Sequence, residues 1–180
     1  EKLICYNNSI THFTHLVNNP ALTHLDANNN QLTGLDVSYS TALEYLDISD
    51  NPNFGGGYTG IDLSNTIVND FKAANCDLGS IEPCNGTYGY VKIDVSNNSI
   101  TGYIDFTAHP NLTHLNVSNN QISLLDLQSG NTSGIIDMFA NNNQMGFAGI
   151  NVDVSYLAAA QAAWTAPNHI DVGVTIIATP

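Results

Sequence analysis

Positive charge is the scarcest feature of this 180-residue chain. Lysine and arginine together number three against sixteen aspartates and glutamates, so the formal net charge is −13 at pH 7. Nucleic acids and anionic membrane surfaces are bound by clustered cations, which this acidic chain lacks. The composition therefore argues against nucleic acid as a partner. The length indicates one domain that is long enough to bury a continuous core.

Long apolar runs and cysteines are also scarce. No stretch approaches the about 20 apolar residues that span a bilayer, so we expect no membrane insertion. Cys5 stands at an inward strand position and Cys76 at the position of a recurring asparagine, and both are expected in the core. Cys84 follows in a turn-rich segment. A Cys76–Cys84 disulfide is therefore one alternative, provided that the chain matures in an oxidising compartment. No zinc-like spacing of cysteine and histidine occurs, so we expect no metal and no cofactor.

Asparagine, by contrast, recurs at a regular spacing. Around Asn30 the frame consists of Leu25, Ala27 and Leu32, and the same apolar spacing surrounds the other recurring asparagines. The gaps from Asn8 to Asn30 and from Asn30 to Asn51 are 22 and 21 residues. A period this short is typical of a solenoid, in which each repeat forms one coil.

The alternation within each repeat predicts a short strand whose apolar side chains point inward and whose polar side chains point outward. Where the chain leaves that strand, inward-facing peptide groups need partners, and a carboxamide offers both donors and an acceptor. We therefore expect a structural ladder, one side chain per coil. Its members are Asn8, Asn30, Asn51, Cys76, Asn98, Asn120 and Asn143.

The pattern L-x-x-L-x-(L/V/A)-x-x-N-x-L resembles the leucine-rich repeat family over about residues 2 to 155. The central leucine position is held by Leu25, Leu46, Phe71, Ile93, Leu115 and Met138. The resemblance implies a solenoid with a short parallel β-sheet on its concave face and extended or turn segments on its convex side. It also implies that cysteine is accepted at the asparagine position, and that the sheet face is the common binding surface.

The two ends of the chain differ. Residues 156–163 are strong helix formers, and residues 169–177 alternate like a strand, so we expect a C-terminal cap of a helix followed by a strand. The predicted organisation is a solenoid of about seven coils over residues 1–155 and a cap over residues 156–180. At Glu1 the sequence enters a strand directly, and we expect either that residues before it have been removed or that a neighbouring chain or domain covers the N-terminal coil.

The outward side chains of the strands are the candidate partner-binding face. They combine aromatic, histidine and charged residues on a rigid sheet, which suits a protein or glycan ligand. A solvated face without any partner is the alternative. The candidate residues are His24, Asp26, Tyr45, Asp47, Asp70, Lys72, Lys92, Asp94, His114, Asn116, Asp137 and Phe139.

Two further patterns point away from ligands. A column of carboxylates on the second side supplies too few converging oxygens for calcium, and we expect these groups to be solvated or bonded to turn amides. The column consists of Asp36, Asp62, Glu82, Asp105 and Asp126. Residues 55–60 match G-x-G-x-x-G, but the extended segment 61–63 follows where a nucleotide site needs a helix.

No nucleophile or acid–base arrangement is recognisable, so we expect no catalytic residues and no enzyme activity. The sequence favours a non-catalytic recognition module on a secreted or surface-displayed protein, such as an adhesion protein, that binds protein or glycan through its sheet face. Repeats of this kind look like those of bacterial surface proteins. The alternative is a structural subunit of a larger particle, such as a phage virion decoration or tail protein, assembled through its ends and loops. The expected location is extracellular, at the cell surface or in a virion.

Overall fold

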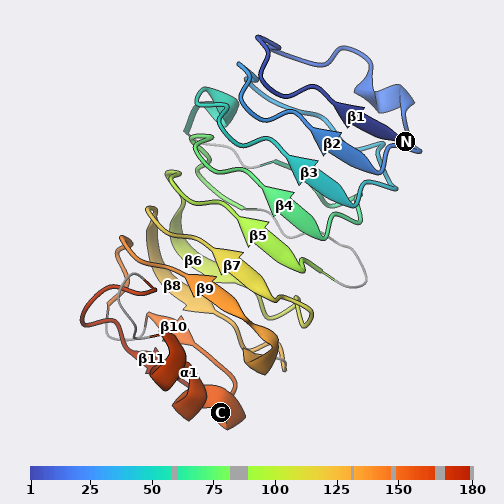
Figure 1. Ribbon diagram of the computed structural model, residues 1–180. Helices are drawn as coiled ribbons and strands as arrows, with labels where there is room; N and C mark the ends of the chain where they lie inside the picture. The colour runs from blue at the N-terminus through green and yellow to red at the C-terminus, as the bar shows by residue number, and fades with distance from the viewer. Residues whose placement is uncertain (58–60, 82–88, 131, 147–148, 165–168, 179–180) are drawn as a thin grey trace.

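The computed structural model describes residues 1–57, 61–81, 89–130, 132–146, 149–164 and 169–178. The chain winds into stacked coils, and each coil adds one strand to a seven-stranded parallel sheet, here called sheet A (Figure 1). In spatial order its strands are β1 (Lys2–Ile4), β2 (His24–Asp26), β3 (Tyr45–Asp47), β4 (Asp70–Lys72), β5 (Lys92–Asp94), β7 (His114–Asn116) and β9 (Asp137–Phe139). The predicted solenoid with a parallel sheet is confirmed.

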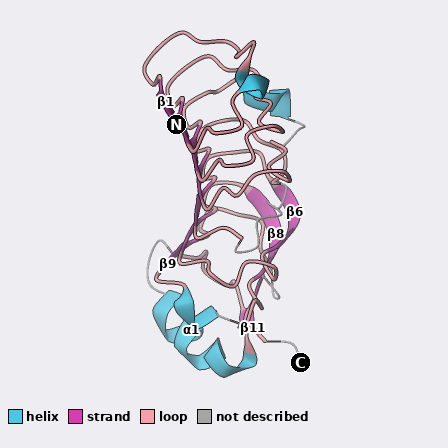
Figure 2. Ribbon diagram, turned by 90° about the vertical axis from the view of Figure 1, so that its right-hand side faces the viewer, coloured by secondary structure: helices cyan, strands magenta, loops and turns pink. Residues whose placement is uncertain are grey.

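A second parallel sheet, sheet B, lies on the opposite side of the solenoid (Figure 2). In spatial order it contains β11 (Ile176–Ile177), β10 (Ile150–Asn151), β8 (Gln121–Asp126) and β6 (Thr101–Asp105). Four 3-10 turns complete the coils: η1 (Leu16–Asn18), η2 (Phe54–Gly57), η3 (Thr132–Gly134) and η4 (Val154–Tyr156). The second side is therefore extended or turn-like, as predicted, and among the described residues its strands belong to the C-terminal coils.

The core fills the space between the two sides. Leu25, Leu46 and Phe71 are paired in register on successive strands, and all three side chains are almost completely buried. Each coil thus stacks its apolar side chains directly on those of its neighbour. Because every coil packs mainly on adjacent coils, the accuracy of the stacking depends on what fixes the register between them.

Asn120 shows how the ladder fixes that register. Its Nδ2 donates to the carbonyl of Val95 in the preceding coil at 2.9 Å. The same nitrogen contacts the carbonyls of Val117 at 3.1 Å and Ser118 at 3.2 Å in its own coil. Its Oδ1 accepts the backbone N–H of Ile100 at 3.1 Å, again in the preceding coil. One side chain therefore serves four backbone groups of two coils.

The same arrangement recurs at most of the predicted ladder positions. Asparagines with backbone partners in both coils are Asn30, Asn51, Asn98 and Asn143. Asn8 departs from the prediction of a buried ladder residue. It is exposed and bonds only to the carbonyls of Cys5 and Tyr6, because the structure contains no coil before it.

Cys76 occupies the ladder position of the fourth coil as a free, buried thiol. Its sulfur donates to the carbonyl of Ile48 in the preceding coil at 3.0 Å. A thiol is a weaker acceptor than a carboxamide oxygen, but the backbone of Asn51 in the preceding coil interacts with it. That coil also closes through the N–H of Phe54, which bonds to the carbonyl of Asn51 at 3.0 Å at the start of η2. Cys84, the other half of the disulfide left open by the sequence, lies outside the described residues.

A second structural position lies directly before each ladder residue. Seven residues there have left-handed backbones, with φ between 50° and 58°: Asn7, Asn29, Asp50, Asn75, Asn97, Asn119 and Asn142. Asparagine and aspartate tolerate this conformation better than other residues that carry a Cβ. Some of these side chains also bond to one another, as Asn142 Nδ2 does to Asn119 Oδ1 at 2.7 Å. The need for this backbone explains the repeated Asn-Asn pairs of the sequence.

The C-terminal region contains the predicted helix, α1 (Leu157–Trp164), but the predicted strand over residues 169–177 is largely wrong. Only Ile176–Ile177 form a strand, β11. The residues before β11 serve a different purpose. Asp171 accepts the N–H groups of Asn142 at 2.7 Å and Asn143 at 2.9 Å.

These contacts replace a missing coil. In the preceding coil, the equivalent N–H groups of Asn119 and Asn120 bond to carbonyls of the following coil at 2.9 and 3.1 Å. The N–H of Ala140 likewise finds the carbonyl of His169 at 2.6 Å. The carboxylate of Asp171 and the carbonyl of His169 thus accept the N–H groups at the last strand of sheet A that the backbone of a further coil would otherwise accept. The division of the chain at residue 155 stays a prediction.

We predict that Asn120→Ala lowers the free energy of unfolding by about 1–3 kcal/mol, because buried backbone groups lose their partner. The matched control is Asn8→Ala, which removes an exposed carboxamide and should cost distinctly less. Urea unfolding of both variants measures the difference. Equal losses in the two variants would contradict a role for the ladder in joining coils.

Cysteine reactivity gives a second check of the ladder. Burial raises the pKa of the Cys76 thiol to about 12. Because the thiolate is the reactive form, we expect Cys76 to resist alkylation at pH 8 in the folded protein and to react in urea. Half-buried Cys5 should be labelled first. Peptide mass spectrometry assigns each label, and alkylation of Cys76 at equal rates with and without urea would refute its burial.

Candidate functional site on the outward face of sheet A

The register of sheet A brings the predicted candidate residues onto one face. The first column of outward side chains contains Lys2, His24, Tyr45, Asp70, Lys92, His114 and Asp137. The second contains Ile4, Asp26, Asp47, Lys72, Asp94, Asn116 and Phe139. The two columns are those expected from the alternation. Their role in binding stays a prediction.

Many polar groups of the second column stabilise turns. The Oδ1 atoms of Asp47 and Asp94 each accept the N–H two residues later, from Ser49 and Ser96, at 3.0 Å. Asn116 does the same with Ser118 at 3.2 Å. These bonds hold the chain as it turns out of each strand. The sequence analysis missed this role, although the repeated D-x-S spacing was a signal of it.

Around Tyr45 the side chains of the face are already packed on one another. The ring stacks on His24, with 5.9 Å between centroids. The ammonium of Lys72 lies 5.1 Å from the centre of the tyrosine ring and donates to its hydroxyl at 3.3 Å. Burial raises the pKa of Tyr45, and the charge of Asp47 raises it further. This end of the face is a preorganised aromatic and cationic cluster.

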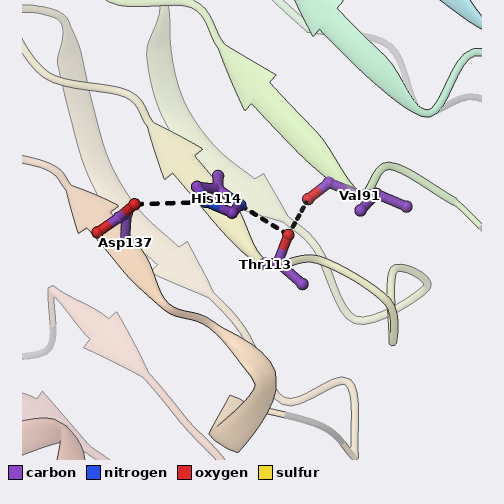
Figure 3. A network of polar contacts seen from close by, with 4 residues as sticks. All are labelled: Val91, Thr113, His114 and Asp137. Atoms are coloured by element: carbon purple, nitrogen blue, oxygen red, sulfur yellow. Dashed lines mark hydrogen bonds and ion pairs between the residues drawn. The ribbon is translucent and has the colours of Figure 1, made fainter.

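A polar chain crosses from β5 to β9 (Figure 3). The hydroxyl of Thr113 donates to the carbonyl of Val91 at 3.0 Å, so its oxygen must accept from Nδ1 of His114 at 2.8 Å. Nε2 of His114 then lies 3.4 Å from a carboxylate oxygen of Asp137. The arrangement therefore orients the imidazole between Thr113 and Asp137.

A cavity of about 230 Å³ opens on this face over β4, β5, β7 and β9. Its lining includes Lys72, Lys92, His114 and the half-exposed ring of Phe139. His169 stacks on that ring at 5.0 Å between centroids. The cavity thus lies among candidate residues from four strands, and sequence spacing alone could not show that a hollow forms there.

The distribution of cations singles out the same face. The chain has no arginine, and its three lysines are Lys2, Lys72 and Lys92. Each of them is in an outward column of sheet A. The remaining surface of the described residues therefore has no lysine or arginine, while sheet A presents both signs of charge.

Four of the second-side carboxylates bond to turn amides, as the sequence predicted for such groups. Asp36, Asp62 and Asp105 accept the N–H groups of Ser38, Ser64 and Thr107 at 2.8–3.0 Å, and Asp126 bonds in the same way to Gln128. Hydrogen bonds from those residues lower the pKa of Asp36, Asp62 and Asp105. Glu82 lies outside the described residues. Within the described ranges, no three His, Cys, Asp or Glu side chains gather as a metal site would require.

The glycine-rich segment that matches G-x-G-x-x-G is described only up to Gly57, since residues 58–60 lie outside the described ranges. The residues that follow, 61–63, form no helix. The helix N-terminus that a nucleotide-binding loop requires is therefore not formed by residues 61–63.

Comparisons with known proteins agree with this architecture. A family model described as Leucine Rich Repeat matches residues 111–142. Among solved structures, the chain is similar to the functional domain of InlJ from Listeria monocytogenes, at 24% identity and a TM-score of 0.55. The match covers 85% of this chain and 39% of that one, so this chain spans well under half of its length. No curated protein matches the chain.

The InlJ structure is described as including a cysteine ladder. The internal ladder of the present chain is made of asparagine, with Cys76 as its cysteine member.

None of the described helices is both long enough and apolar enough to cross a membrane.

We expect stability to fall in acid through the turn carboxylates. The folded-state pKa of Asp105 is lowered by its hydrogen bonds with Thr107, so the stabilisation is complete above the unfolded pKa of about 3.9 and is lost as pH falls through the folded value. Urea unfolding between pH 5 and pH 2.5 measures the loss. Asp105→Asn keeps an acceptor without the charge and should reduce the slope, and an unchanged slope would refute the assignment.

Proposed function

We propose that this chain, which forms a leucine-rich-repeat solenoid, is a non-catalytic module that recognises a protein through the outward face of sheet A. One observation carries the proposal. Every lysine of a chain with a net charge of −13 is on that face, which also carries the aromatic rings of Tyr45 and Phe139. A surface that combines both charge signs with rings suits protein partners.

The rigidity of the face supports the same function. Its strands are held in register by backbone hydrogen bonds and by the asparagine ladder. Binding therefore costs little conformational entropy on this face. The acidic surface around the face would repel anionic partners over long distances and favour partners with positive charge. A glycan ligand would use the same rings and polar groups, and it is the finer alternative at this site.

The composition supports an extracellular or cell-surface location for the module, because asparagine, threonine and serine are abundant and lysine is rare. A second candidate function is assembly into a larger particle through the ends of the solenoid. The inward residues Leu3 and Cys5 of the first coil are only partly buried, whereas their equivalents in the next coil, Leu25 and Ala27, are completely buried, which favours cover by a neighbouring chain, domain or further coil.

We expect a partner captured from the native source to depend on the sheet face. The test variant combines Tyr45→Ala with Lys92→Ala, and the matched control combines Tyr103→Ala with Asp36→Ala on the second side. Capture followed by quantitative mass spectrometry compares both with the parent after their folding has been verified by thermal melting.

Proteins retained by the parent and the control but lost from the sheet-face variant would agree with recognition through sheet A. Retention by all three proteins would contradict it and would direct attention to the ends of the solenoid. Loss from the control alone would place the interface on the second side.

A further inference from the structure

Strands β4 and β5 present a square of alternating charges. β4 carries Asp70 and Lys72 outward, β5 carries Lys92 and Asp94, and the register pairs Asp70 with Lys92 and Lys72 with Asp94. Adjacent strands are about 4.8 Å apart, so each charge has opposite charges as its neighbours along the strand and across it. This square forms part of the lining of the cavity on sheet A.

Two corners of the square are occupied by other contacts. Asp94 bonds to the N–H and hydroxyl of Ser96 through Oδ1 and to Nδ2 of Asn116 through Oδ2. Lys72 is directed to the ring and hydroxyl of Tyr45. Both side chains therefore already have partners within the protein. They contribute to the local electrostatic potential, but they are not the groups that are left for a ligand.

The other two corners have unused capacity. Asp70 is partly exposed, so its carboxylate can be approached from the solvent side. The inner oxygen, Oδ1, is buried and has no hydrogen-bond partner in the part of the chain that the structure describes, so the carboxylate keeps accepting capacity that the fold does not use. Lys92 is exposed and forms no salt bridge with any described residue. An unsatisfied acceptor and an unpaired ammonium thus stand side by side on neighbouring strands.

A ligand that forms an ion pair with both groups carries two signs of charge. A donor facing Asp70 can be an N–H or an O–H, and a cationic donor gains more than a neutral one. A carboxylate facing Lys92 completes the second contact. A ligand with only one sign would place its charge beside a like charge at strand spacing, because Asp70 and Lys92 are adjacent.

We propose that this cavity is the subsite for an extended segment of a protein partner that carries a basic and an acidic side chain close together. The basic group donates to Asp70, the carboxylate binds Lys92, and apolar parts of the segment contact Phe139. The assignment rests on the proposed function, since it names what sheet A recognises. The small volume, about 230 Å³, suits one such pair of side chains.

The test uses the three lysines as reporters, since all of them are on the face. Protein labelled with ¹³C at the lysine ε-carbon gives one signal for each of Lys2, Lys72 and Lys92. The probes are acetyl-Ala-Arg-Ala-Glu-Ala-amide and two versions in which either the arginine or the glutamate is alanine. Lys2, at the far end of the same column, is the internal control.

We expect the peptide with both charges to shift the Lys92 and Lys72 signals with a dissociation constant at least about tenfold lower than either single-charge peptide, while Lys2 is unaffected. Asp70→Asn and Lys92→Met should each reduce the preference to that of a single-charge peptide. Lys2→Met is the matched control and should leave it unchanged. Thermal melting checks that each variant is folded.

Equal affinity for all three peptides, equal shifts at Lys2, or no saturable shift would overturn the subsite. Failure here is distinguishable from failure of the proposed function. If partner capture depends on sheet A but the peptides show no preference, the function stands and the subsite is wrong. If capture is independent of sheet A, the proposed function itself fails, whatever the peptides show.

Discussion

The hydrogen bonds of one buried carboxamide per coil are the constraint on which the molecule depends. A coil of little more than 20 residues has to leave its strand, cross to the second side and return, and it must do so largely without helices that would satisfy its own backbone. Asn120 and its equivalents supply partners to turns that water cannot reach. The left-handed residue before each of them turns the chain so that the carboxamide points inward.

The outward face follows from that internal order. The ladder and the strands hold the coils in register, so the outward side chains of sheet A form straight columns. Charged side chains from neighbouring coils therefore lie at defined distances from one another. The face is also partly built for support: carboxylates such as Asp94 hold their own turns. The groups left for the proposed recognition are those without such contacts, among which Asp70 and Lys92 stand out.

The periodicity of the sequence was enough to predict the solenoid, the parallel sheet, the ladder and both outward columns, since each depends on local spacing. The hydrogen-bond and ion-pair partners of the side chains on this face could not be predicted. Whether Asp70 has a donor or His114 a carboxylate depends on side-chain positions between coils, which spacing does not define. The end of the chain was misjudged for a related reason: residues that alternate like a strand, including His169 and Asp171, cap the last coil instead.

The ladder has a direction. Each asparagine completes the turn of the coil before it, so a coil depends on its C-terminal neighbour for partners that its N-terminal neighbour does not provide. Asp171 ends this dependence by supplying a carboxylate to the last turn. The two ends of the solenoid are therefore chemically different at their turns. Detachment of the C-terminal segment uncovers amide N–H groups of the last coil, whereas detachment of the first coil uncovers carbonyl groups of the second coil and the carboxamide of Asn30.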